Sequence, residues 1–204
     1  MMNFQDQRDK EGNSQSSRVP PGQRLTQGFP ILTYGETPRI PSDQWQLSIT
    51  GQVETEVLLN WKEFMALPKI KVTADFHCVT TWSRLDNLWE GVSTREILKL
   101  TALKPEARYV MVHCYGEYTT NMPLDDFLKT PSLLAYQWQG QPLEAEHGGP
   151  CRLIIPHLYA WKSAKWVRKI ELLDENQRGF WERYGYHIYG DPWREQRYSS
   201  QDDD

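Results

Sequence analysis

Apolar and polar residues alternate in several short stretches of this chain. The clearest stretch covers residues 70–78, where Ile70, Phe76 and Cys78 fall on one side and polar or charged residues on the other. Alternation with a period of two is typical of a β-strand that buries one face. Further strands are predicted over residues 44–49, 109–115, 133–138, 151–155 and 165–172, with a hairpin turn after the third of these.

Three short helices are predicted between these strands. Asn60 and Ser93 each stand three residues before a glutamate, which is the spacing of a capping box at the start of a helix. The helices are expected over residues 61–67, over residues 94–100 and just after Pro123. They are too short and too irregularly spaced for a regular βαβ series, so the predicted fold class is α+β with mixed β-sheets and short helices.

Composition separates the two ends of the 204-residue chain from its middle. Residues 1–24 are rich in Gln, Ser, Asp and Gly and predict a disordered N-terminal arm, while residues 200–204 predict an acidic tail. Residues 25–199 are expected to form one domain. No run approaches the roughly 18 apolar residues of a membrane helix, so no membrane span is predicted. Since the first residues also lack the apolar core of a secretory signal, the expected location is cytoplasmic.

Charge is unevenly distributed along the chain. The net charge is −4, from 23 basic and 27 acidic residues, which gives no general reason to expect a nucleic-acid partner. Residues 147–170 nevertheless contain five basic residues and no acidic ones, namely Arg152, Lys162, Lys165, Arg168 and Lys169. This basic block favours a small anionic ligand, although a solvated strand and loop would have the same composition.

Two segments of the basic block have the composition of a phosphate site. His147 starts a turn with Gly148 and Gly149, whose lack of side chains lets backbone amides approach a ligand, although a plain connection between strands has the same sequence. The run Trp161-Lys162-Ser163-Ala164-Lys165-Trp166 adds two ammonium groups and a hydroxyl. Neither the P-loop spacing nor the Gly-x-Gly-x-x-Gly pattern of dinucleotide-binding folds occurs.

The three cysteines, Cys78, Cys114 and Cys151, have no C-x-x-C spacing and are expected to be reduced thiols. The His77-Cys78 and His113-Cys114 pairs would make a poor zinc site, because neighbouring residues on a strand point to opposite faces. Cys114 is in phase with two valines of its predicted strand, which predicts an inert core thiol.

Cys78 differs from the other two cysteines because it ends its predicted strand, and a side chain at a strand end faces a cleft more often than one in mid-strand. The nearby Arg84 favours the thiolate, which is the form that attacks substrates or binds metal. The local pattern leaves three roles open for Cys78: catalytic nucleophile, metal ligand or core cysteine.

Three motifs, in this order along the chain, resemble the molybdopterin-binding domain of the sulfite oxidase family. They are FHCVTTWSRLDNLWEGVSTREIL around Cys78, HGGPCRLIIPHLYAWKSAKWVRKIEL from His147, and GFWERYGYHIYGDPWREQRYS near the end. The resemblance covers residues 22–199 and is greatest to the small bacterial members, periplasmic methionine-sulfoxide reductases among them. It implies a sulfite-oxidase-type molybdopterin-binding fold that holds one molybdenum on a single pyranopterin dithiolene.

The resemblance also implies roles for individual residues. Cys78 matches the family's cysteine ligand to the metal, and the soft sulfur of a thiolate suits a high-valent molybdenum. Arg84, the cation nearest to it in sequence, is a candidate catalytic residue that would orient the substrate. The residues that match cofactor-binding positions are Thr33, Tyr34, Cys114, His147, Arg152, Ser163, Ala164 and Lys165, with Arg152 and the last three at the pterin phosphate. For Cys114 this match weakens the prediction of an inert thiol.

The expected activity is two-electron oxygen-atom transfer on a small molecule. Where family sulfite oxidases have Ala-Gly-Asn-Arg-Arg after the cysteine, this chain has Val-Thr-Thr-Trp-Ser-Arg, and a single arginine favours a neutral S-oxide or N-oxide over a sulfur oxyanion. The 204 residues contain no segment that resembles the family's dimerisation domain, its haem domain or the export leader of the periplasmic reductases, so these parts are expected to be absent. A monomer that exchanges electrons with a separate redox protein is therefore expected.

Two functions of other classes remain open. One is a cofactor-free thiol enzyme with Cys78 as nucleophile and His77 or His113 as base, although strand alternation predicts that His77 faces away from Cys78. The other is a non-catalytic module that binds a pterin or another anion. Molybdenum and pterin absorbance in the purified protein would separate the oxidoreductase from both.

Overall fold

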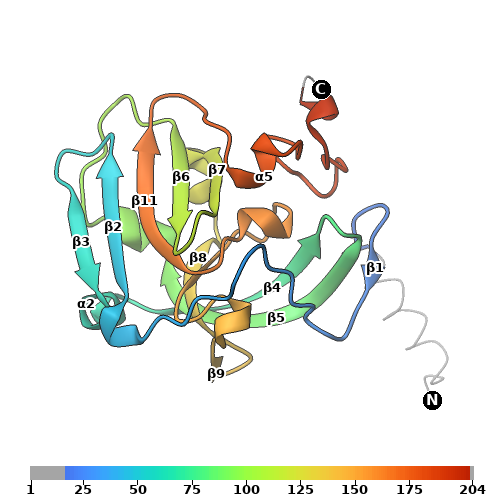
Figure 1. Cartoon of the computed structure of the whole chain (residues 1–204), viewed down its shortest axis with the longest axis horizontal. Helices are drawn as coiled ribbons and strands as arrows, with labels where there is room; N and C mark the ends of the chain where they lie inside the picture. Colours follow the sequence, from blue (N-terminus) through green and yellow to red (C-terminus); the bar gives the residue numbers. More distant parts are fainter. Residues whose placement is uncertain (1–16, 203–204) are drawn as a thin grey trace, which may run out of the picture.

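Two mixed β-sheets pack against each other in this computed structural model, which describes residues 17–202 (Figure 1). The first sheet contains β1 (Arg24–Leu25), β4 (Ile70–Cys78), β5 (Trp82–Ser93), β8 (Leu133–Trp138), β9 (Gln141–Pro142) and β10 (Arg152–Ile154). The second contains β2 (Gln46–Gly51), β3 (Val57–Asn60), β6 (Tyr109–Cys114), β7 (Thr119–Pro123) and β11 (Val167–Leu173), in the order β3-β2-β11-β6-β7. The pairs β1–β5 and β2–β11 are parallel, and the other paired strands are antiparallel.

Short helices connect the strands. They are α2 (Trp61–Ala66), α3 (Thr94–Leu98), α4 (Leu124–Phe127) and α5 (Phe180–Arg183), with 3-10 turns η1 (Ser42–Gln44), η2 (Ala145–His147), η3 (Ala160–Lys162) and η4 (Ser199–Gln201). This arrangement confirms the predicted α+β class. None of the described helices is long and apolar enough to cross a membrane.

The local patterns with strong signals form the elements they predict. β4 and β8 have the predicted bounds. At the start of α2, the Asn60 side chain accepts a hydrogen bond from the Glu63 backbone N–H (3.0 Å), and the Glu63 carboxylate accepts one from the Asn60 N–H (2.8 Å). At α3 the Ser93 hydroxyl accepts a hydrogen bond from the Glu96 backbone N–H (3.2 Å), but the Glu96 carboxylate bonds Lys99 in place of the Ser93 N–H, so only half of the predicted capping box forms. This helix ends at Leu98, two residues before the predicted end.

The longest described strand, β5, was not predicted. Its register against β4 shifts between Ala74 and Phe76, and its register against β8 shifts between Glu90 and Gly91. The first shift adds one residue to β5 and the second adds one to β8. The extra residue in β5 breaks its alternation of apolar and polar positions, so the strand is hard to recognise in the sequence. Gly91 also lies so close to β8 that a Cβ would stand 2.1 Å from the Leu134 carbonyl oxygen. The short strands β3 and β7 were not predicted either.

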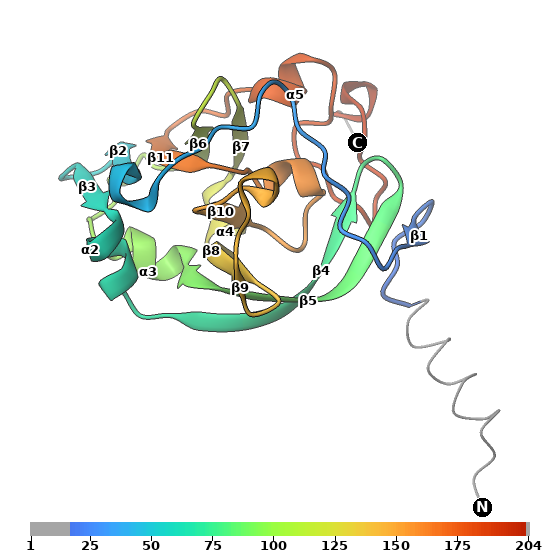
Figure 2. The same ribbon diagram turned by 60° about the horizontal axis from the view of Figure 1, so that its bottom comes forward.

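The core contains two groups of buried side chains. The larger group lies between the sheets and includes Trp45, Val112, Leu134 and Ile170. The smaller group lies on the β4–β5 hairpin around Phe76, Trp82 and Trp89. Residues 26–41 leave β1 at the tip of that hairpin and cross the molecule to β2, as the blue segment in Figure 2 shows. This crossing segment covers the edge where the two groups meet.

Both ends of the described chain are attached to the domain, which differs from the predicted boundaries. Residues 1–16 of the predicted arm and residues 203–204 of the predicted tail lie outside the described residues. Arg18 pairs with Asp75 (2.5 Å) and Asp86 (2.6 Å) on the β4–β5 hairpin, and Arg24 begins β1. At the other end Asp202 pairs with Arg178 (2.5 Å). Specific ion pairs and hydrogen bonds, which composition does not reveal, order these polar segments.

Candidate functional site

A cavity of about 310 Å³ opens beside the end of β4. Its wall is formed by residues 29–34 of the crossing segment, by the turn after β4, by η3 with the loop that leads to Trp166, and by side chains from α5 and the residues after it. Most of this wall is aromatic or aliphatic. Eight of the ten site residues predicted from the sequence line it, namely Thr33, Tyr34, Cys78, His147, Arg152, Ser163, Ala164 and Lys165.

Cys78 contributes a thiol to this cavity from the last position of β4. Its Sγ lies 3.1 Å from the Thr80 hydroxyl oxygen, at hydrogen-bond distance. Burial raises the pKa of the Cys78 thiol, while the Thr80 contact and the positive charge of Arg197 act in the opposite direction. The thiol is therefore protonated at neutral pH unless a cation or a metal binds beside it.

Neither candidate base is near that thiol. The His77 ring points to the other face of β4, where its Nδ1 lies 2.8 Å from the Ser83 hydroxyl, and burial lowers its pKa to about 4. His113 lies on the second sheet, where its Nε2 is 2.7 Å from a Glu171 carboxylate oxygen. A thiol that attacks substrates needs a base within hydrogen-bond reach. The geometry therefore disfavours the cofactor-free thiol enzyme.

Arg152 places a positive charge at the cavity without a carboxylate to balance it. Its side chain is almost fully buried and donates to the carbonyl oxygens of His147 (2.8 Å) and Ser163 (2.9 Å). Its Nε is buried and has no partner within the described chain. Burial lowers the pKa of this guanidinium to about 9. An unbalanced buried cation with a free donor is costly by itself and fits an anion that binds in the cavity.

Lys165 adds a second charge to the same end of the cavity. Its Nζ donates only to neutral oxygens: the carbonyls of Leu32 (2.9 Å) and Glu146 (2.6 Å) and the Thr33 hydroxyl (3.0 Å). Burial, together with the charge of Arg152, lowers the pKa of Lys165 to about 7. A bound dianion would reverse this shift and keep the lysine charged.

Gly148 makes room for the two cations. Its φ is +103°, and a Cβ at this position would stand 2.9 Å from the Cβ of Lys165 and 3.0 Å from that of Arg152. Only glycine adopts this conformation without strain and leaves this space open. The sequence prediction that this turn belongs to an anion site agrees with its placement.

The remaining predicted cofactor residues form the wall. The His147 ring stacks on Phe29 with 4.7 Å between ring centroids and 7° between the planes. The Ser163 hydroxyl accepts a hydrogen bond from the Ile155 N–H (2.9 Å), so it holds its own loop in place while the Ser163 carbonyl holds Arg152. Ala164 follows at the cavity surface.

Two predicted site residues lie elsewhere. Arg84 stacks on Trp138 (4.7 Å from guanidinium carbon to ring centroid) and donates to the Asn87 side chain (2.5 Å), outside the cavity that Cys78 lines. Arg84 pairs with Phe76 in the β4–β5 register, two residues before the end of β4, and its contacts with Trp138 and Asn87 hold its side chain outside the cavity. Cys114 is fully buried in the larger core group and does not reach the cavity. The expectation that Arg84 would orient substrate is therefore wrong in its geometry, and the placement of Cys114 agrees with a core thiol.

The other basic residues of the block also have separate roles. Lys162 is fully buried and pairs with Glu182 (2.5 Å) beneath the wall. Arg168 is exposed and bonds the Cys114 carbonyl (2.9 Å), while Lys169 pairs with Glu171 (3.2 Å). The register of β11 against β6 shifts between Val167 and Lys169, so strict alternation along β11 does not tell which of these side chains faces solvent. Only Arg152 and Lys165 of the five basic residues line the cavity.

Sequence analysis missed the aromatic part of the wall. Trp82, Trp161 and Trp166 lie beneath it, and Trp181 and Tyr186 cover it from the C-terminal segment. The Tyr186 hydroxyl makes no hydrogen bond with the described residues, and burial, with the nearby Cys78, raises its pKa. The motif GFWERYGYH that carries Trp181 and Tyr186 was part of the family resemblance, but no periodicity assigned these two residues to the cavity.

Comparison with known proteins identifies the family of the chain. Residues 34–181 match the family described as "Oxidoreductase molybdopterin binding domain". The chain is 49% identical over 188 residues to "Uncharacterized oxidoreductase YuiH" of Bacillus subtilis, a match that covers 92% of this chain and 95% of that protein. The chain therefore belongs to the molybdopterin-binding oxidoreductases of the sulfite oxidase family, as its motifs predicted.

More distant relatives are named for several different activities. "Protein-methionine-sulfoxide reductase catalytic subunit MsrP" of Campylobacter jejuni is 25% identical over 166 residues, which cover 73% of this chain and 56% of that protein. "Nitrate reductase [NADPH]" of Fusarium oxysporum is 26% identical over 192 residues, 78% of this chain and 20% of that protein. The structure of the sulfane dehydrogenase SoxCD from Paracoccus pantotrophus has the same fold, with a TM-score of 0.65 at 20% identity over 73% of this chain and 42% of that one.

The residues of the cavity fit the molybdenum cofactor that this family implies. Arg152 and Lys165 supply two positive charges for a phosphate, and the orphaned Nε of Arg152 supplies a donor. Within residues 17–202, no three His, Cys, Asp or Glu side chains come together to hold a metal ion. A metal at Cys78 would therefore take its remaining ligands from the cofactor.

Proposed function

We propose that this oxidoreductase carries out two-electron oxygen-atom transfer on a small S-oxide or N-oxide, at a molybdenum bound by a single pyranopterin dithiolene and by Cys78. The observation that carries the proposal is the combination, in one cavity, of a single thiol and two cations that have no carboxylate partner. For a sulfoxide the balanced reaction is R₂SO + 2e⁻ + 2H⁺ → R₂S + H₂O.

Each group of residues has a separate task in this proposal. Arg152 and Lys165 would hold the terminal phosphate, the first with two-donor geometry and the second as a point charge. Cys78 would lose its proton and serve as the protein's only ligand to the metal. When bound, the cofactor supplies the metal centre that exchanges electrons and the oxygen atom. The ring stack of His147 on Phe29 would shape the pocket beside the cofactor.

The surroundings of Cys78 support a neutral substrate. The adjoining wall is formed by Val79, Thr80, Trp82 and Tyr186, and the two lining cations, Arg152 and Lys165, are assigned to the phosphate. Arg84 lies outside the cavity, so the presence of a single arginine after Cys78 says nothing about the charge of the substrate. The free Tyr186 hydroxyl is suited to donate a hydrogen bond to the oxygen of a polarised S=O or N–O group. An anion such as sulfite or nitrate would find no third cation among the described residues that line the cavity, since the guanidinium of Arg197, the other cation near Cys78, is engaged by the Val79 carbonyl outside the lining.

Two-electron oxygen-atom transfer needs a donor or an acceptor of electrons in addition to the substrate. We therefore propose a separate electron-transfer partner. The monomeric state and the cytoplasmic location stay predictions from the sequence.

The test compares Cys78→Ser with Cys151→Ser, whose thiol is buried away from the cavity. X-ray absorption at the molybdenum edge should show one sulfur fewer in Cys78→Ser and no change in Cys151→Ser, with the cofactor retained in both. An unchanged sulfur count in Cys78→Ser would contradict the ligand assignment. Purified protein without molybdenum or pterin would contradict the whole proposal.

Substrate class is tested on the parent protein. Dimethyl sulfoxide, methionine sulfoxide and trimethylamine N-oxide are offered with a reduced viologen dye, nitrate with the same dye, and sulfite with ferricyanide. We expect turnover with at least one neutral oxide and higher kcat/KM for it than for either anion. Turnover of sulfite or nitrate alone would refute the preference for a neutral substrate.

A further inference from the structure

The thiol of Cys78 is presented by a tight turn between β4 and β5. The Thr81 N–H donates to the Cys78 carbonyl (3.0 Å), and Thr81 itself has a φ of +70°, in the left-handed region that non-glycine residues rarely adopt. A turn of this kind needs support from its surroundings to stay in one conformation. The support comes from the two ends of the described chain.

The N-terminal side of this support is Gln23. Its side-chain amide donates to the Cys78 carbonyl oxygen (3.1 Å), and its amide oxygen accepts a hydrogen bond from the Ser83 hydroxyl (3.4 Å). The next residue, Arg24, donates its backbone N–H to the Thr81 carbonyl (3.0 Å). Gln23 thereby connects the residue before the turn to the strand after it.

The C-terminal side is Arg197. Its Nη1 donates to the carbonyl oxygen of Val79 (2.6 Å), the residue directly after Cys78. The guanidinium lies over the Tyr159 ring, 5.1 Å from its centroid, and only 13% of the side chain is exposed. A charge-assisted hydrogen bond with so little contact with water is stronger than an ordinary one.

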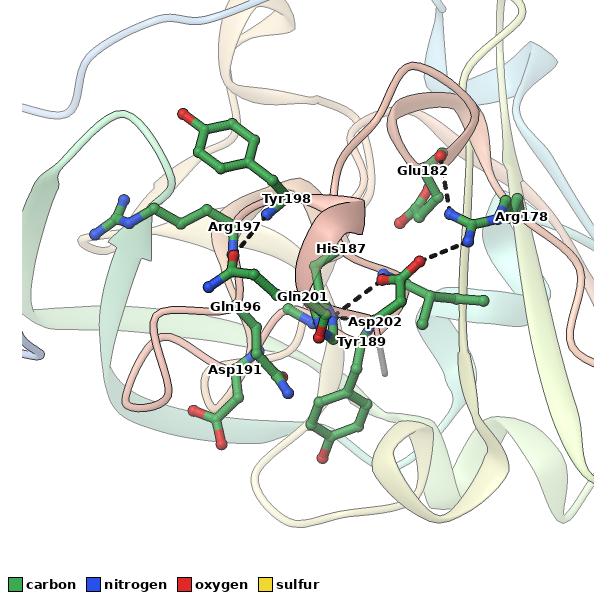
Figure 3. A network of polar contacts seen from close by, with 12 residues as sticks. Arg178, Glu182, His187, Tyr189, Asp191, Gln196, Arg197, Tyr198, Gln201 and Asp202 are labelled. Atoms are coloured by element: carbon green, nitrogen blue, oxygen red, sulfur yellow. Dashed lines mark hydrogen bonds and ion pairs between the residues drawn. The ribbon is translucent and has the colours of Figure 1, made fainter. Parts of the chain in front are cut away.

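Arg197 is itself held by the end of the chain. Its backbone N–H donates to the side-chain oxygen of Gln201 (2.9 Å), and its backbone carbonyl accepts a hydrogen bond from the His187 N–H (3.1 Å). Asp202 then binds the Ile188 N–H (2.8 Å) and Arg178 (2.5 Å). In Figure 3 the Arg197 side chain extends away from this network of polar contacts.

The two ends also touch each other. Gly22, which precedes Gln23, has a φ of +67°, and a Cβ there would stand 2.8 Å from a Glu195 carboxylate oxygen and 3.3 Å from Nη2 of Arg197. The segments that hold the turn are therefore packed together rather than acting from separate places. Both lie outside residues 34–181, the part of the chain that matches the family.

We propose that Gln23 and Arg197 are positioning residues that clamp the Cys78 turn from the two ends of the chain and so fix the direction of its thiol. The importance of this clamp for catalysis rests on the proposed function, in which Cys78 is the metal ligand. The clamp itself rests only on the contacts of the two side chains with the carbonyls of Cys78 and Val79.

The first test measures the rate at which iodoacetamide alkylates Cys78 in the cofactor-free full chain, at one fixed pH. Cys114 and Cys151 are fully buried, and Cys78→Ser gives their background rate. We expect alkylation to be about tenfold faster in Arg197→Met, because loss of a charge-assisted hydrogen bond of this strength changes the opening equilibrium by about that factor. Arg197→Lys, which keeps a charged donor, should stay near the parent rate.

The matched control is Arg168→Met. Arg168 also donates to a backbone carbonyl, that of Cys114, but on the second sheet and away from the cavity. The Arg168→Met substitution should leave the alkylation rate of Cys78 unchanged, even if it lowers the Tm as much as Arg197→Met does. Loss of the positive charge alone would leave less thiolate and slow alkylation in Arg197→Met. A slower or unchanged rate in that variant would therefore overturn the clamp.

The second test uses the loaded enzyme. Arg197→Met and Gln23→Leu should keep molybdenum and pterin but lower kcat by about tenfold with little change in KM, and Arg197→Lys should restore most of it. An unchanged kcat in both Arg197→Met and Gln23→Leu would overturn the role of the clamp in catalysis. Failure of the Cys78 ligand assignment appears instead as an unchanged sulfur count in Cys78→Ser and leaves the alkylation result intact.

Discussion

Replacing Arg152 by methionine should have opposite effects on protein stability and on cofactor retention. Burial lowers the pKa of this guanidinium to about 9, and at about 1.36 kcal/mol per pH unit the cost in the cofactor-free protein is roughly 5 kcal/mol. The hydrogen bonds to the carbonyls of His147 and Ser163 offset about 1.5 kcal/mol each. Arg152→Met should therefore raise the free energy of unfolding of the cofactor-free protein by about 2 kcal/mol, or its Tm by about 4–8 °C.

Cofactor retention should change in the other direction. A charge-assisted hydrogen bond to a phosphate contributes about 1.5–3 kcal/mol, so its loss should weaken retention between about tenfold and a hundredfold. The cofactor-free proteins, made in cells that cannot synthesise molybdopterin, are compared by calorimetry. The loaded proteins are compared by molybdenum and pterin content per chain. Lys169→Met is the control, because Lys169 pairs with Glu171 outside the cavity.

The two measurements together test why this arginine is buried. Full cofactor content in Arg152→Met would show that the charge does not hold the phosphate. A lower Tm in cofactor-free Arg152→Met than in the cofactor-free parent would show that the buried charge supports the fold by itself. Either result would refute the reasoning that the fold tolerates a buried cation because an anion binds there.

Two further predictions concern the neighbouring lysines. Because the folded-state pKa of Lys165 is lowered to about 7, the unfolded cofactor-free chain binds more protons than the folded chain between about pH 7 and pH 10. Stability in urea titrations should therefore rise with pH over this window, and less so in Lys165→Met; equal slopes would contradict this. Lys162→Met should lower the free energy of unfolding by about 3–5 kcal/mol, because it leaves the Glu182 carboxylate buried and unpaired. The double variant Lys162→Met with Glu182→Gln should recover most of this loss. A double variant in which the costs of the two substitutions simply add would contradict the prediction.

Local sequence patterns were sufficient where an element depends on its own residues. β4 has its predicted bounds because apolar and polar residues alternate along it, and β8 because a turn follows it directly. α2 begins at the predicted cap because Asn60 and Glu63 bond each other across three residues. Arg152 and Lys165 also stand out in the sequence, because they belong to a run with no acidic residues in an otherwise acidic chain. Three motifs in order along the chain were enough to predict the family, and the spacing of strands and helices was enough to predict the fold class.

The site itself depended on contacts between distant positions. Lys162 and Lys165 look equivalent in the sequence, yet Lys162 is neutralised by Glu182, twenty residues further on, and only Lys165 reaches the cavity. A shift of strand register hid β5, and contacts with Trp138 and Asn87, which are distant or unpatterned in the sequence, hold Arg84 outside the cavity.

The amino-acid sequence alone was therefore enough to predict the fold class, the family, the principal strands and the charges available for an anion. Only the tertiary structure decided which of those charges remain unbalanced and what holds the Cys78 turn, where Gln23 and Arg197 act from 55 and 118 positions away. The physical reason is that periodicity reports which face of an element is buried, whereas a hydrogen bond or an ion pair requires a partner within about 3 Å, and the sheet pairing brings that partner from elsewhere in the chain.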